Sequence, residues 1–184
     1  MKHLKIYFPL SLLLILIACG SSKNGLNQVK IPFKGNAYES NRRFFRSVAS
    51  GESINLETAR SKALLIANQR IASSVQTEIK NVTENYLNER KDGNQLGDYG
   101  ERFQQLTREV MSTSINGMRT FDEKVFMKTD KSYQVWVAVE ARKKDIYKRM
   151  KQTAKERSTL SEKEKIAIAE MIDKAIEDTG DLDN

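Results

Sequence analysis

A long run of apolar residues at helical spacing is the feature that most limits how this chain can fold. The run consists of Leu64, Ala67, Ile71, Val75, Ile79, Val82 and Tyr86. Steps of three and four residues place these side chains on one face of an α-helix, and Asn55 is well placed to cap its first turn. We predict a helix over residues 56–90. At ~1.5 Å per residue it is about 50 Å long, so we expect it to bend or to overhang a small domain.

Small residues recur along this helix, and a second helix follows it. Ala59, Ala63 and Ala67 form a low ridge that lets a sheet or another helix approach the backbone closely. We interpret this ridge as packing, and the neighbouring Arg60 as a solvated or sheet-edge cation. A second apolar run, formed by Tyr99, Phe103, Leu106 and Val110, predicts another helix that ends near Gly117.

Alternating apolar and polar residues predict a β-hairpin over residues 119–128 and 132–140. The apolar set of the first strand is Phe121, Val125 and Met127, and that of the second is Tyr133, Val135, Val137 and Val139. A three-residue loop over residues 129–131 is favoured, because only an odd loop keeps both sets on one face. This register pairs Met127 with Tyr133, Val125 with Val135, and Phe121 with Val139.

The remaining hairpin residues raise two questions. Phe126 and Trp136 lie on the opposite face, which is therefore either partly covered or exposed to a partner. Glu123 stands among the apolar residues. We expect it to lie at a sheet end and to pair with Lys or Arg, the alternative being a buried acid with a raised pKa.

A further strand is expected over residues 44–50, ended by a turn at Gly51. The order is then strand, helix, helix, strand, strand, helix. This order predicts an α+β fold in which an antiparallel sheet of about three strands is packed by two long helices, with additional C-terminal helices.

The two C-terminal helices carry opposite charges. Residues 142–157 hold eight basic residues against two acids, whereas residues 159–184 hold three lysines against eight acids. Ser161 and Glu164 have the spacing of a capping box at the start of the terminal helix. The basic helix has three open interpretations: a solvated face, a face paired with the acidic helix, or a face that contacts anionic lipid headgroups.

Composition excludes most catalytic sites. The chain has one His (His3) and one Cys (Cys19), so it lacks the residues for a multi-histidine zinc site or a cysteine cluster. His3 lies in the predicted leader, so the mature chain has no His and cannot form a Ser-His-Asp arrangement. It has no nucleotide-binding glycine motif. Asp122 and Glu123 are adjacent acids, but strand alternation sends them to opposite faces. We expect no enzymatic activity, no metal and no cofactor, with a carboxylate-based hydrolase of envelope polymers as a remote alternative.

The N-terminus predicts export. Lys2 and Lys5 precede an apolar run over residues 6–17, which is too short to span a bilayer and is typical of a signal peptide. The run ends in Leu-Ile-Ala-Cys-Gly, which resembles the lipobox of bacterial lipoproteins. The resemblance implies cleavage before Cys19 and acylation of its sulfur. Since Asp does not follow Cys19, it also implies an outer-membrane lipoprotein, and we favour the periplasmic side. Export removes nucleic acid as a partner.

Three stretches resemble one known family. Residues 46–53 are similar to its first strand and glycine turn, residues 56–67 to its Ala-Arg-x-x-Ala helix, and residues 133–139 to its closing strand. On these stretches the chain is identified as resembling the twenty-kilodalton lipoproteins, or LPP-twenty-like domains. The resemblance implies a helix packed on an antiparallel sheet in an outer-membrane lipoprotein, with no catalytic residues.

The expected organisation is a lipoprotein signal peptide over residues 1–18, a lipid-anchored tether over 19–41, the α+β domain over 42–157, and an acidic helix and tail over 158–184. We expect an interaction module that docks onto envelope proteins or onto itself. Its expected surface is Phe126, Trp136, Arg142, Lys143, Lys148 and Arg149. The alternative is a binding module with a cleft for a small apolar or aromatic ligand between helix and sheet, lined by Tyr133, Val135 and Val137.

Overall fold

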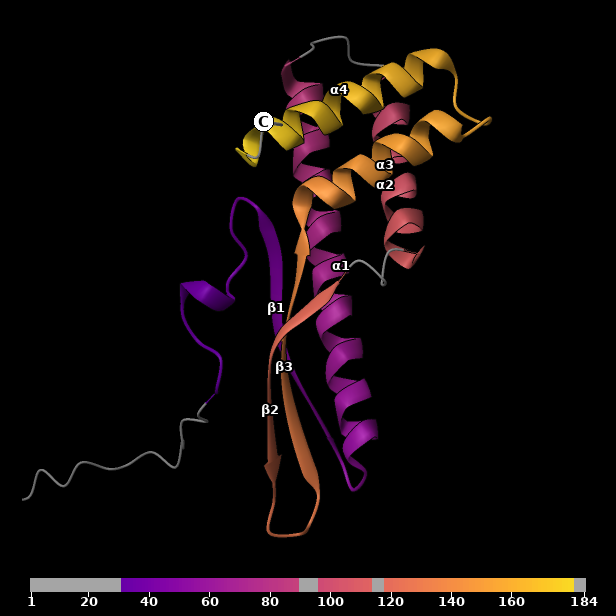
Figure 1. Cartoon of the computed structure of the whole chain (residues 1–184). Helices are drawn as coiled ribbons and strands as arrows, with labels where there is room; N and C mark the ends of the chain where they lie inside the picture. The colour runs from indigo at the N-terminus through magenta and orange to yellow at the C-terminus, as the bar shows by residue number, and fades with distance from the viewer. Residues whose placement is uncertain (1–30, 90–95, 114–117, 181–184) are drawn as a thin grey trace, which may run out of the picture. The chain divides into compact units, whose positions relative to one another are not determined.

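The computed structural model describes residues 31–89, 96–113 and 118–180. The predicted signal peptide, the predicted lipobox and Cys19 lie outside this range. From Pro32 onward the described residues belong to one unit, in which a three-stranded antiparallel sheet packs with four helices (Figure 1). The predicted α+β class is confirmed.

Helix α1 (Leu56–Glu89) begins where the sequence predicts. The side-chain Oδ1 of Asn55 accepts a hydrogen bond from the Thr58 N–H at 3.0 Å, so the predicted N-cap is present. The first half of the helix lies along the sheet, and its second half extends past it to meet the other helices (Figure 1). The expected overhang is therefore covered by α2 (Leu96–Thr113) and its neighbours rather than left in solvent.

Strands β1 (Phe44–Ser53), β2 (Arg119–Met127) and β3 (Tyr133–Arg142) form the sheet in the order β1-β3-β2. Both pairings are antiparallel. Helix α1 contacts β1 and β3 extensively. The residues of these two strands that face it are buried, namely Phe45, Ser47, Ala49, Gly51, Val135, Val137, Val139 and Ala141.

The predicted end of β1 at Gly51 is wrong. Gly51 pairs with Val135, and the strand continues to Ser53. A Cβ atom at Gly51 would lie 2.2 Å from the Ala59 carbonyl oxygen and 2.6 Å from the Ala63 nitrogen. Glycine is therefore required here because the helix backbone touches the strand, and the buried alanine ridge permits that approach.

The hairpin register agrees with the prediction over most of its length. Met127 pairs with Tyr133 and Val125 with Val135, and the Lys128 N–H donates to the Ser132 carbonyl at 2.8 Å, which closes a three-residue loop. Lys131 has a φ of 65°, as such loops need. The predicted pairing of Phe121 with Val139 is wrong.

A register shift at Phe121 explains that error. Thr120 pairs with Val139 and Asp122 with Ala138, so Phe121 is an extra residue on its strand. The bulge turns its ring to the face of the sheet opposite α1, called the outer face below. There it stacks on Tyr38 with ring centroids 5.8 Å apart, and the Arg46 guanidinium lies 5.5 Å from its centroid.

Residues 32–41, expected as part of a tether, instead pack against the outer face. Phe33 is 3% exposed and its ring lies 5.0 Å from that of Tyr38, within a segment that contains a short 3-10 helix, η1 (Asn36–Tyr38). The Tyr38 hydroxyl donates to Asp122 Oδ2 at 2.9 Å. The outer face is therefore partly covered.

Helices α3 (Lys143–Glu156) and α4 (Glu162–Asp178) pack on each other. Ser161 and Glu164 form the predicted capping box in both directions. Helix α4 buries Ile168, Met171 and Ile172 in the same core as α1. The acidic terminal helix is thus part of the packed unit.

Candidate interaction surface

The two outer strands of the sheet present different edges. In β2, the residues Glu123 to Met127 are called the β2 edge. Lys128 and Ser132 are hydrogen-bonded across the hairpin, and bonded pairs alternate along an antiparallel ladder. Lys124 and Phe126 therefore bond to β3, whereas the N–H and C=O groups of Glu123, Val125 and Met127 point away from the sheet. Within the described residues no group bonds to these outward atoms.

The side chains of the β2 edge are exposed and apolar. Val125 is 43% exposed, Phe126 44% and Met127 70%. Helix α1 packs on β1 and β3 and leaves the α1-side face of β2 open. A bare edge strand with three consecutive exposed apolar residues is a template for another strand. This surface includes Phe126, one of the residues selected from the sequence.

One salt bridge holds the β2 edge to α1. The Arg60 Nε lies 3.0 and 3.1 Å from the two Glu123 carboxylate oxygens, and its Nη2 lies 2.9 Å from Oε1. Hydrogen bonding to Glu123 raises the pKa of Arg60. The expectation that Glu123 pairs with a cation is confirmed, and Arg60 is the sheet-edge cation considered above. The expected place at a sheet end is wrong, because Glu123 lies in the middle of β2, opposite Val137.

A charged row crosses all three strands on the outer face. Glu140 on β3 stands between its cross-strand partners Arg46 on β1 and Arg119 on β2, and bonds to both. Burial of the Glu140 carboxyl raises its pKa, but the hydrogen bonds and charges of the two arginines outweigh that effect, so its net pKa is lowered. The row stabilises the strand order rather than creating a binding site.

The basic residues of the expected surface do not lie together in the structure. Lys143 is buried and does not belong to any surface: its Nζ bonds to Glu78 and lies 4.6 Å from the Phe45 ring centroid. The Glu78 carboxylate also accepts the Tyr147 hydroxyl. Burial, and then the Glu78 charge and hydrogen bond, raise the pKa of Tyr147, so this cluster is a structural link between α1 and α3.

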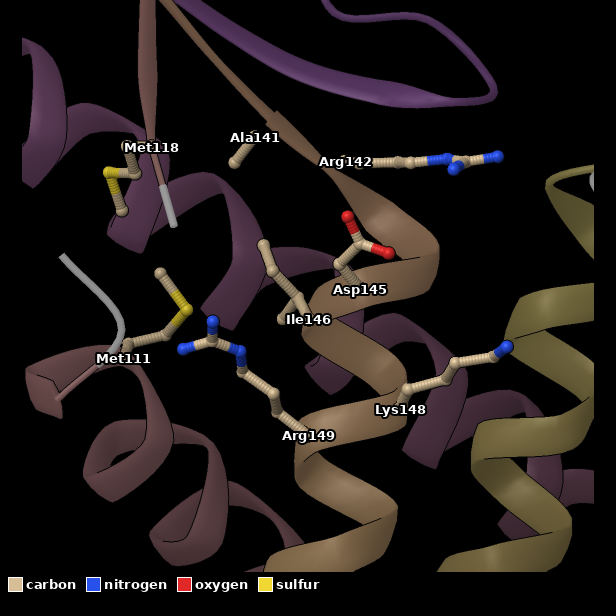
Figure 2. A pocket seen from close by; sticks show the side chains of 8 residues that line it. All are labelled: Met111, Met118, Ala141, Arg142, Asp145, Ile146, Lys148 and Arg149. Atoms are coloured by element: carbon tan, nitrogen blue, oxygen red, sulfur yellow. The ribbon is translucent and has the colours of Figure 1, made fainter. Parts of the chain in front are cut away.

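Arg142, Lys148 and Arg149 border a hollow of about 300 Å³. Its other lining residues are Met111, Met118, Ala141, Asp145 and Ile146. Figure 2 shows the Arg149 guanidinium beside Met111 and Ile146, whereas Arg142 and Lys148 extend away from the hollow. Trp136 is half-buried on the outer face and does not join this group. The expected surface is therefore not one continuous patch.

Salt bridges connect the basic helix α3, with Arg157 at its C-terminal end, to two other helices. Lys151 bonds to Asp173 of α4 at 2.6 Å, and Arg157 bonds to Glu109 of α2. The first contact agrees with the interpretation that α3 pairs with the acidic terminal helix, and the second involves a helix that charge patterning did not suggest.

The expected ligand cleft is filled. Val135 and Val137 are 0% exposed and belong to the core beneath α1, and Tyr133 is only partly buried at the end of the sheet. The small ridge of α1 explains this, because it lets the helix lie directly on the valines and leaves no gap.

The described residues, 31–89, 96–113 and 118–180, contain neither a metal-binding cluster of acidic, His or Cys side chains nor a membrane-spanning helix. No group of three or more His, Cys, Asp or Glu within them has a geometry that could hold a metal ion. None of their helices is long and apolar enough to cross a membrane.

Comparisons with protein-family models, with curated proteins and with solved structures find no match for this chain.

Sequence reasoning missed the groups that close the other edge of the sheet. Asn41 bonds to both the N–H and the C=O of Phe44, and Ser40 Oγ does the same for Arg46. Arg70 bonds to the Val48 carbonyl, and Lys62 to the Glu52 carbonyl at 3.1 Å. Only the run Val125-Phe126-Met127 gave a sequence signal for the opposite, bare edge.

Proposed function

We propose that this chain is a lipid-anchored envelope lipoprotein that acts as a structural and interaction module, resembling the LPP-twenty-like domains. Acyl chains on Cys19 attach it to the outer membrane, and the folded unit faces the periplasm. Two or three acyl chains suffice for stable anchoring, since each buried methylene contributes about 0.8 kcal/mol. The N-terminal sequence supports the anchor.

The observation that carries the interaction role is the β2 edge. Its unbonded backbone groups stand beside exposed Val125, Phe126 and Met127. An added strand bonds to such backbone groups, and its side chains cover the apolar ones. The interaction module is favoured over a small-ligand binding module because the core beneath α1 is filled at Val135 and Val137.

The anchor is tested by Cys19→Ser in the full chain expressed with its leader. Acylation is read by metabolic labelling with an alkynyl fatty acid, and location by separating inner and outer membranes. We expect labelling and outer-membrane recovery to be lost in the variant. Equal labelling of Cys19→Ser and the parent chain would contradict the anchor.

The interaction role is tested by placing a photo-crosslinking residue at Met127 in cells. Ile166 on α4, which is 59% exposed, is the matched control position. We expect discrete crosslinked products from position 127 and none from position 166. An absence of products at position 127 would contradict a docking role for the β2 edge.

A further inference from the structure

We propose that the occupant of the β2 edge is a second copy of the same chain, paired antiparallel through β2 about a twofold axis at Val125. This inference rests on the interaction role proposed above and names its partner. It joins two three-stranded sheets into one of six strands, in the order β1-β3-β2-β2-β3-β1.

Backbone geometry limits the possible registers. The outward groups belong to Glu123, Val125 and Met127, so these residues must face one another across the axis. The axis therefore passes through a residue and not between two. An axis at Glu123 or Met127 lets only one of these three residues face its counterparts, so an axis that uses two or more of them passes through Lys124, Val125 or Phe126.

The charges of the facing residues distinguish the three possible positions of the axis. An axis at Lys124 places two lysines directly opposite each other. An axis at Phe126 places Lys124 opposite Lys128 and Asp122 opposite Asp130 of the other copy. Like charges directly opposite each other are destabilising, so both registers are disfavoured.

An axis at Val125 is self-complementary. It places Asp122 opposite Lys128 and Lys124 opposite Phe126, and each pairing occurs twice by symmetry. The Asp122 carboxylate can still accept a hydrogen bond from Lys128 of the other copy, because Tyr38 bonds only to its Oδ2. Lys128 has three donors, of which the contact with Glu52 uses one.

Within the described residues, the β2 edge is more open to this pairing than the β1 edge. Helix α1 lies over β1 and β3, so it does not occupy the space beside β2 (Figure 1). On the opposite edge, Asn41 and Ser40 bond to the outward groups of Phe44 and Arg46, and Arg70 and Lys62 bond to the Val48 and Glu52 carbonyls, so these side chains obstruct a continuous added strand. A copy that pairs through β2 alone forms a closed pair and not a filament.

Cysteine crosslinking in cells tests the pairing. Val125→Cys in the full chain places two thiols at the axis, where α-carbons of a bonded antiparallel pair are about 5.5 Å apart. Ile166→Cys is the matched exposed control, and the parent chain reports any reaction of Cys19. With a short bismaleimide we expect Val125→Cys to give at least about tenfold more product of twice the chain mass than the control.

A second pair of variants tests the register. Lys124→Cys in one tagged copy is co-expressed with Phe126→Cys in a differently tagged copy. We expect this mixed pair to crosslink more than Lys124→Cys alone, because the two positions face each other only when the axis is at Val125.

Val125→Pro tests the edge without disturbing the fold. It removes an outward N–H and leaves the bonds between β2 and β3 in place. Two symmetry-related hydrogen bonds are lost, so we expect the Lys124→Cys and Phe126→Cys crosslink to fall about tenfold.

Two outcomes would overturn the inference. One is a Val125→Cys crosslink no stronger than that of Ile166→Cys, and the other is a product of another mass in place of the doubled one. Photo-crosslinked products from position 127 together with either outcome would leave the interaction role standing with a different partner. Membrane recovery, measured in the same cells, tests the lipid anchor separately.

Discussion

The two edges of the sheet show how one fold can protect one side and leave the other available. On β1, the N–H and C=O groups of Phe44 and Arg46 and the carbonyls of Val48 and Glu52 are bonded by nearby polar side chains or backbone. On β2, the outward groups of Glu123, Val125 and Met127 have no such partners within the described residues. An unpaired edge invites association, so the difference supports the proposal that β2 is the side that meets a partner.

The largest loss of stability is expected from a change at Gly51, where β1 contacts the backbone of α1. Gly51→Ala places a Cβ atom 2.2 Å from the Ala59 carbonyl oxygen and 2.6 Å from the Ala63 nitrogen, so the helix or the strand must shift to accept it. We expect a loss of about 3 kcal/mol in the free energy of unfolding, measured by denaturant titration. The matched change on the other edge is Val125→Ala, which we expect to cost less than about 1 kcal/mol because Val125 is half exposed. Equal losses would contradict the contrast.

A smaller loss of stability is expected when the charged row of Arg46, Glu140 and Arg119 is broken. Arg46→Met leaves the buried Glu140 carboxylate with Arg119 alone, and we expect a loss of about 2 kcal/mol at neutral pH. The Arg119 side chain is 74% exposed, so Arg119→Met should cost less. Thermal unfolding of both variants measures the difference. A larger loss of stability for Arg119→Met than for Arg46→Met would contradict this order and show that Arg119 on β2 contributes more.

The same row predicts a pH dependence. The pKa of Glu140 is lowered in the folded protein, so its stabilising contribution is fully present above the pKa of an unfolded glutamate, about 4.3. The contribution is lost as the pH falls through the lower, folded value. We expect the difference in unfolding free energy between the parent chain and Glu140→Gln to shrink as the pH is lowered from 7 to 3. A difference that stays constant over this range would contradict the assignment.

The smallest effect is expected when the caps of β1 are removed. In the double variant Lys62→Ala, Arg70→Ala, water replaces the two side chains at the Glu52 and Val48 carbonyls. We expect unfolding free energy to change by less than about 1 kcal/mol, with the Val125→Cys crosslink unaltered. Loss of that crosslink would mean that the two edges are not independent.

The sequence by itself determined most of the local structure. Helical spacing predicted α1 and its start, alternation and loop parity predicted the hairpin register at Val125 and Met127, and the Ser161–Glu164 spacing predicted a capping box. These features depend on residues close together in the chain. The N-terminal lipobox and the proposed anchor at Cys19 are also read from sequence alone.

Tertiary structure decided the rest. Gly51 resembles a turn residue until the backbone of α1 is placed against it, and the bulge at Phe121 follows from the packing of Tyr38 over the outer face. Burial of Lys143 beside Glu78 removed a residue from the expected surface. Which strand lies at an edge, and whether distant side chains close that edge, depend on contacts between residues far apart in the sequence. For that reason only the tertiary structure separates the partly capped edge of β1 from the bare edge of β2.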